Sequence, residues 1–194
     1  MSALGLNLTS AWHELKNRPS AEWGATLDLV RLGLGDHVDT VVVALDPGSG
    51  HGALYLKLTS SDDPIPAANL SDGQLTWLAY VAMARLGGDR SLLAIDEPEL
   101  RLHPALLGRV MGLLTDLPGS PQVVIGTHSD RVLAMLDDPA DAVRVCSLEG
   151  GKAVVSRLDP AELPRWLDEF GDLGQLRASG YLDRVVAEPA PTDE

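Results

Sequence analysis

Two short apolar runs joined by a helical segment constrain the fold of this chain more than any other feature. The runs are residues 92–95 and 122–126, and each is continuous, as expected of a strand buried on both faces. Between them, leucines and valines recur at helical spacing after Pro104, a residue favoured at helix starts. A strand, a helix and a strand in this order predict a right-handed crossover between parallel strands near 91–96 and 122–127. We therefore expect an α/β protein.

Side chains suited to phosphate chemistry follow both runs. Asp96 and Glu97 end the first run, and His128 follows the second. Because the carboxyl ends of parallel strands meet at one sheet edge, where open α/β sheets bind ligands, we expect these three residues to converge. In such a site Asp96 could hold a hydrated magnesium ion, Glu97 could deprotonate an attacking water, and His128 could donate to a phosphate oxygen. Adjacent acids after a strand can equally be solvated loop residues.

A third candidate element begins at Ser71. Ser71 and Gln74 match the S-x-x-Q capping box, and apolar residues from Leu75 to Leu86 follow at helical spacing. Gly73 leaves the first helical turn uncovered, so an anion could approach its N–H groups and the positive end of the helix dipole. An ordinary capped helix explains the same residues, and on this pattern alone it is the simpler interpretation.

The remaining segments predict smaller elements. A helix is expected after Ser20 as its N-cap, and two hairpins are expected, one joining residues 38–45 to 53–58 and one turning at residues 150–151. No stretch matches the P-loop pattern G-x-x-x-x-G-K-[ST], so the glycines of both hairpins are interpreted as turn residues. Cys146 lies in an alternating apolar stretch and is predicted to be a small core residue.

Composition limits the class of partner. The chain has 194 residues, enough for one domain with a sizeable core, and neither a membrane-length apolar run nor a signal pattern. Its net charge is −13, and its 15 Lys and Arg residues are scattered singly. We therefore expect a cytoplasmic protein with no membrane segment and no direct nucleic-acid contact of its own. The Ala-, Pro- and acid-rich residues 187–194 are predicted to be a disordered tail.

Taken together, the motifs resemble those of ABC-type ATPases. Residues 70–74 (Leu-Ser-Asp-Gly-Gln) are similar to the signature LSGGQ, residues 92–97 look like a Walker B strand with its glutamate, and residues 127–129 look like the switch-histidine segment. The Asp-Glu-Pro-Glu and Leu-His-Pro pairing and the ending at residues 166–180 resemble the AAA-type ATPases grouped with RecF, SMC and OLD-like proteins. The resemblance covers roughly residues 5–184.

The resemblance implies ATP hydrolysis with ATP and Mg²⁺ as cofactors. Asp96 would be the acid that holds Mg²⁺ through water, Glu97 the general base and His128 the sensor of the γ-phosphate. In the resembled family two ATPase heads sandwich ATP, so a dimer is expected. The signature residues that would contact nucleotide on the opposite protomer are Ser71, Gly73 and Gln74. Asp72 stands where many members have glycine, which adds negative charge near the phosphate.

The larger departure concerns Walker A, which lies upstream of the signature in the resembled family. Residues 1–186 are therefore expected to form the C-terminal half of an ABC-type domain, a partial P-loop NTPase fold with flanking helices and small hairpins. Truncation, a mis-started gene and a separate chain carrying Walker A are open alternatives, and the expected partner is a second head or a Walker A half. A non-catalytic interaction module that keeps only the dimerisation surface is the other interpretation. Without the P-loop strand, residues 122–126 and 143–148 should not pair with each other.

Overall fold

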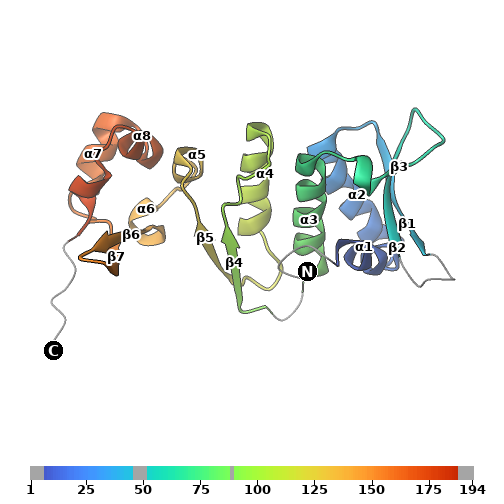
Figure 1. Ribbon diagram of the computed structural model, residues 1–194, viewed down its shortest axis with the longest axis horizontal. Helices are drawn as coiled ribbons and strands as arrows, with labels where there is room; N and C mark the ends of the chain where they lie inside the picture. Colours follow the sequence, from blue (N-terminus) through green and yellow to red (C-terminus); the bar gives the residue numbers. More distant parts are fainter. Residues whose placement is uncertain (1–6, 46–51, 88–89, 188–194) are drawn as a thin grey trace. The chain divides into compact units, whose positions relative to one another are not determined.

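The computed structural model describes residues 7–45, 52–87 and 90–187. It divides into two compact units, Met1–Gly126 and Thr127–Glu194, each with its own hydrophobic core (Figure 1). The chain combines helices and strands and contains a parallel strand pair, so the predicted α/β class is confirmed. The turn of the first hairpin (residues 46–51) and nearly all of the predicted tail (residues 188–194) lie outside the described residues.

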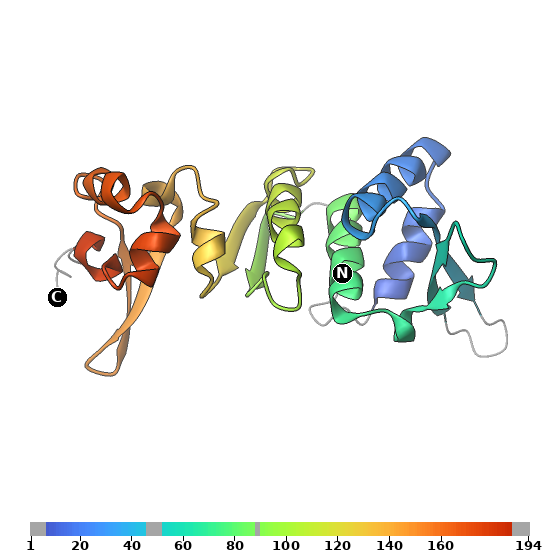
Figure 2. The same cartoon turned by 90° about the horizontal axis from the view of Figure 1, so that it is seen from above.

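The first half of unit 1 packs helices on an antiparallel sheet. The helices are α1 (Leu8–Lys16), α2 (Ser20–Leu34) and α3 (Asp72–Leu86), and the strands are β1 (Val38–Leu45), β2 (Gly52–Leu58) and β3 (Ile65–Pro66), with the 3-10 helix η1 (Ala67–Asn69) leading into α3. Figures 1 and 2 show the three helices grouped on one face of this sheet. The first predicted hairpin is confirmed by the antiparallel pairing of β1 with β2.

Two details of the N-terminal helices differ from the prediction. Helix α1, whose buried face includes Trp12, was not predicted. Ser20 is the first residue of α2 and not its N-cap, because Pro19 occupies that position without a side-chain hydrogen bond. The proline ring fixes φ near −50°, so the helix can begin directly after it without a capping side chain.

Helix α3 is the centre of the unit 1 core. Trp77 is fully buried, and its indole N–H donates to the Leu29 carbonyl of α2 at 3.1 Å. Gly33 of α2 makes room for the ring, since a Cβ at that position would overlap the Trp77 side chain. Because α1, α2 and α4 all pack on α3, its buried surface is wider than the single stripe predicted from apolar spacing. Its buried residues are Trp77, Leu78, Val81, Ala82 and Ala84.

The second half of unit 1 is the predicted crossover. Strands β4 (Leu92–Asp96) and β5 (Gln122–Gly126) are parallel, and α4 (Pro104–Thr115) connects them (Figure 1). The parallel pairing confirms the topology derived from the two apolar runs. In the described part of the chain β5 is hydrogen-bonded to β4 and to no other strand, as expected for residues 122–126.

The expectation that these strands are buried on both faces is wrong. On one face, four side chains pack against the core that includes Val110 of α4: Leu93, Ile95, Val123 and Ile125. On the other face Leu92 is 54% exposed and Val124 is 49% exposed. A continuous apolar run does not distinguish a covered face from a face left apolar and open, and only one face has packing partners in this core.

Unit 2 contains a hairpin and short helices. Its elements are α5 (Asp130–Leu133), α6 (Pro139–Ala142), β6 (Arg144–Glu149), β7 (Lys152–Arg157), α7 (Leu163–Phe170), α8 (Leu173–Ala178) and the 3-10 helix η2 (Leu182–Val185). The antiparallel pairing of β6 with β7 confirms the second predicted hairpin, whose turn residues Gly150 and Gly151 have φ of 57° and 81°. The core consists of Leu158, Leu163, Leu173, Leu176 and Val185.

The prediction for Cys146 is wrong, because its side chain is exposed. Cys146 pairs with Val155 across the hairpin, and Val155 is 63% exposed. The neighbouring Val145 packs against the unit 2 core instead. The alternation correctly predicted a strand, but a one-residue difference in register exchanges the covered face for the open one.

Candidate functional site

The first turn of α3 has the predicted capping box. The Gln74 N–H donates to the Ser71 hydroxyl at 3.3 Å, and the Ser71 N–H donates to the Gln74 side-chain oxygen at 2.9 Å. The N–H groups of Asp72 and Gly73 are first-turn amides that have no acceptor within the helix. These N–H groups can donate hydrogen bonds to an anion, and the positive end of the helix dipole favours its negative charge.

Gly73 is required by a close backbone contact. A Cβ at position 73 would lie 2.9 Å from the Arg101 carbonyl oxygen, which is closer than such atoms approach in proteins. The Arg101 guanidinium in turn lies 3.5 Å from the Asp72 carboxylate. The negative charge at position 72, the departure noted in the sequence, is therefore balanced by Arg101. Neither contact was predicted, since nothing in the spacing links residues 72 and 101.

Two carboxylates lie at the carboxyl end of β4. Asp96 is exposed and opposes Gly126, where a Cβ would come within 2.7 Å of the Asp96 Oδ1. Glu97 follows with φ of 45°, and its N–H donates to the Gly126 carbonyl at 2.7 Å. A left-handed conformation costs a non-glycine residue about 1–3 kcal/mol, and such strain concentrates at functional sites. The backbone of Glu97 is thus fixed against β5.

The segment after Glu97 packs against α3. Pro98 is buried, and the Tyr80 hydroxyl donates to its carbonyl at 3.4 Å. Burial, followed by the negative charge of Glu99, raises the pKa of Tyr80 to about 12. Tyr80 therefore stays a neutral hydrogen-bond donor throughout the physiological pH range.

Two histidines, His103 and His128, lie next to these elements in the sequence and have different surroundings. His103 is the N-cap of α4, where its ring Nδ1 accepts from the Ala105 N–H at 3.2 Å, which is a structural role. His128 is exposed, and its carbonyl accepts from Arg177 at 3.0 Å within unit 2. Asp96 and Glu97 belong to unit 1, so the convergence of His128 with them stays a prediction.

The residues at β4 fit magnesium as an ion shared with a phosphate ligand. In the described ranges there is no cluster of three or more His, Cys, Asp or Glu side chains that would form a protein-only metal cage. Mg²⁺ is commonly held by one or two carboxylates together with waters and phosphate oxygens. The exposed Asp96 is suited to that kind of binding.

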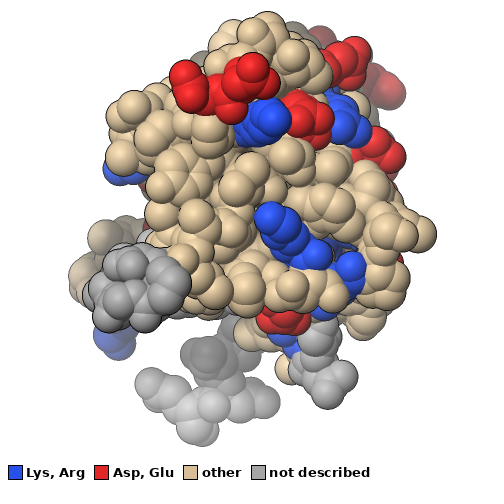
Figure 3. Space-filling model, turned by 90° about the vertical axis from the view of Figure 1, so that its right-hand side faces the viewer, with Lys and Arg blue, Asp and Glu red and all other residues tan. Residues whose placement is uncertain are grey.

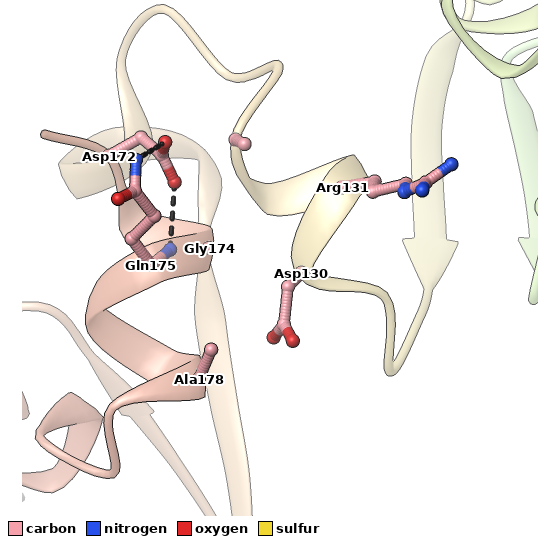
Figure 4. A pocket seen from close by; sticks show the side chains of 7 residues that line it. Asp130, Arg131, Asp172, Gly174, Gln175 and Ala178 are labelled. Carbon is pink, nitrogen blue, oxygen red and sulfur yellow. Dashed lines mark hydrogen bonds between the residues drawn. The ribbon is translucent and has the colours of Figure 1, made fainter. Parts of the chain in front are cut away.

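An open pocket of about 200 Å³ lies between α5 and α8 in unit 2. Figure 4 shows Asp172 hydrogen-bonded to Gln175, with Arg131 pointing away from both. The hydrogen bonds from Gln175 lower the pKa of Asp172, which caps α8. Asp130 is ion-paired with Arg177. Both carboxylates of this pocket, Asp130 and Asp172, thus have partners within the protein.

The basic side chains are scattered over the surface in Figure 3, as they are along the sequence. On the face of the molecule in Figure 3, basic side chains are few, those near the top stand beside acidic ones, and most of the surface is uncharged. Arg18, for example, is paired with Glu14 and Glu22. None of the helices in the described ranges combines the length and apolar character needed to cross a bilayer.

The parallel crossover, with carboxylates at the end of its first strand, is that of a P-loop ATPase fold. Solved structures of SMC heads are similar to this chain. One, an SMC ATPase studied for its ATP-driven dimerisation and DNA-stimulated activation, is 18% identical with a TM-score of 0.53 and covers 77% of this chain and 92% of that chain. Another, the Pyrococcus furiosus Smc head, is 19% identical with a TM-score of 0.55 and covers 77% of this chain and 37% of that one. At this identity the similarity shows the fold alone.

The chain belongs to the family described as "AAA domain, putative AbiEii toxin, Type IV TA system", which matches residues 18–134. The Old nuclease of Escherichia phage P2 is 36% identical over 84 residues, a match that spans 40% of this chain and 14% of that protein. The predicted membership of the RecF, SMC and OLD-like group of P-loop ATPases is confirmed.

Proposed function

We propose that this chain is the part of an ATP-hydrolysing domain that carries the signature motif, the Walker B acids and the switch histidine. It acts in a dimeric head together with a segment or chain that supplies Walker A. The observation that carries the proposal is the carboxyl end of β4, where Asp96 and the left-handed Glu97 stand beside the parallel strand β5. Family membership supports an ATPase-like domain.

Each candidate residue has a defined task in this proposal. ATP with Mg²⁺ supplies the phosphoanhydride and its charge-neutralising cation. Asp96 holds the cation through water, and Glu97 accepts the proton of the attacking water. His128 donates a hydrogen bond to a γ-phosphate oxygen. The residues that contact nucleotide bound to the opposite protomer are Ser71, Gly73 and Gln74.

A second candidate function is a non-catalytic interaction module. The open apolar face of β4 and β5, where Leu92 and Val124 are about half exposed, favours a role in association. No P-loop pattern occurs in the sequence, which is compatible with either function. Hydrolysis that depends on Glu97 distinguishes the two.

The test is Glu97→Gln in the complete ATPase, reconstituted with the Walker A-bearing segment. The amide keeps the size of the side chain but cannot take up the proton, so turnover should fall about 10²- to 10⁴-fold while ATP binding is retained. Glu169→Gln, at an exposed position of α7, is the matched control and should hydrolyse ATP normally. Unchanged turnover in the Glu97 variant would show that Glu97 is not the base.

A further inference from the structure

We propose that Arg101 is a positioning residue that ties the loop bearing Glu97 to the first turn of α3. The loop comprises residues 97–102 and is called here the 97–102 loop. The inference rests on the proposed function, because it concerns how Glu97 is held for catalysis. Its structural part stands on contacts within unit 1 alone.

Arg101 contacts the first turn of α3 with both its backbone and its side chain. Its carbonyl oxygen occupies the space that a side chain at Gly73 would fill, and its guanidinium lies 3.5 Å from Asp72. Arg101 has φ of 64°, a left-handed conformation that a non-glycine residue keeps only when its surroundings hold it there. Two consecutive residues of α3 thus define the position of one loop residue.

The rest of the 97–102 loop is fixed by contacts on either side of Arg101. The Leu100 N–H donates to the Glu97 carbonyl at 3.0 Å, and the Leu102 N–H donates to the Glu99 carbonyl at 3.2 Å. About two helical turns beyond Gly73, Tyr80 donates to the Pro98 carbonyl at 3.4 Å. The 97–102 loop is therefore held to α3 at two places, at Arg101 and at Pro98.

Gly73 and Asp72 both contribute to the position of the 97–102 loop. Asp72 would oppose an anion at the first turn of α3, and Arg101 offsets that charge while it holds the loop. The exposed pair is weak by itself, because both side chains are about two-thirds exposed to solvent. The close approach of the Arg101 carbonyl to Gly73 adds a second restriction on the position of the 97–102 loop.

The first experiment measures amide hydrogen exchange of the 97–102 loop in the full chain without nucleotide. Arg101→Ala should raise loop exchange about 2- to 5-fold, the size expected for an exposed ion pair. Arg101→Lys should stay near wild type, and Arg101→Glu should exceed the alanine variant because two like charges then face each other. Arg109→Ala, at an exposed position of α4, is the matched control and should not change the loop.

Two further variants separate the pair from the backbone contact. Asp72→Asn should reproduce the effect of Arg101→Ala, and the double variant should exchange no faster than either single one. Gly73→Ala should raise loop exchange about 10-fold or more, since the carbonyl of Arg101 must move away. Gly112→Ala in α4, where a Cβ meets nothing within 4 Å, should leave the loop unchanged.

Hydrolysis provides a readout that a purely structural role would not move. In the reconstituted ATPase, Arg101→Ala should lower kcat about 2- to 5-fold with KM for ATP unchanged, and Arg101→Lys should restore kcat. Unchanged loop exchange in both the Arg101→Ala and Gly73→Ala variants would overturn the tie, as would faster exchange spread evenly over unit 1. Because exchange is measured without nucleotide, these outcomes are independent of whether Glu97→Gln abolishes turnover.

Discussion

Ionisation of Tyr80 should destabilise the protein at high pH. Its pKa is raised to about 12 by burial and by Glu99, whereas an unfolded tyrosine titrates near 10. Below about pH 10 the phenol is neutral in both states, so its contribution to stability is fully present. As the pH rises toward 12, the unfolded state loses its proton first and unfolding becomes more favourable.

The size of this effect follows from the pKa difference. Two pKa units at 1.36 kcal/mol each give an upper bound of about 2.7 kcal/mol. Tyr80 keeps some contact with solvent, which screens its charge, so we expect a loss on the order of 1–2 kcal/mol between about pH 9 and 12. Tyr80→Phe removes the titrating group but keeps the ring.

The assay is urea unfolding of the wild type and of Tyr80→Phe at several pH values between about 9 and 12. Other groups titrate in both proteins, so the difference between the two curves isolates Tyr80. The wild type should lose stability relative to the variant as the pH rises. Parallel curves over this range would refute the assignment of a raised pKa to Tyr80.

Two further predictions concern packing and nucleotide binding. Gly33→Ala should cost about 1–3 kcal/mol of unfolding free energy, because the new Cβ overlaps the buried Trp77 ring, whereas Gly24→Ala in the same helix meets open space and should be neutral or stabilising. Urea unfolding measures both, and an equal effect at the two positions would contradict the packing. Calorimetric titration of the chain alone with Mg-ATP should show no stoichiometric micromolar binding, since the chain has no P-loop pattern. Tight binding by a monomer would reveal a different phosphate site.

Local patterns predicted the elements that local chemistry determines. The capping box of Ser71 and Gln74 and the parallel pairing of β4 with β5 follow from spacing and from the handedness of crossovers, and both are confirmed. The exposure of Cys146 and Val124 was not predictable in the same way. An apolar residue on a strand indicates a strand, but which face finds a packing partner depends on elements far away in the sequence.

The contacts between distant loops were also beyond the sequence patterns. Arg101 lies 29 positions after Asp72 (101 − 72), and no periodicity connects them. Their contact arises because β4 follows α3 in the chain and ends beside the first turn of that helix. The sequence pattern indicated that Gly73 leaves the first turn of α3 uncovered, but it gave no sign that the Arg101 carbonyl approaches the same position.

The left-handed backbone of Glu97 places stability and activity in opposition at one residue. Glycine adopts this conformation without strain, so a glycine there would relax the backbone by about 1 kcal/mol. It would also remove the carboxylate on which the proposed hydrolysis depends. Selection for stability alone would therefore favour glycine at position 97. Selection for hydrolysis would favour an acid at the same position.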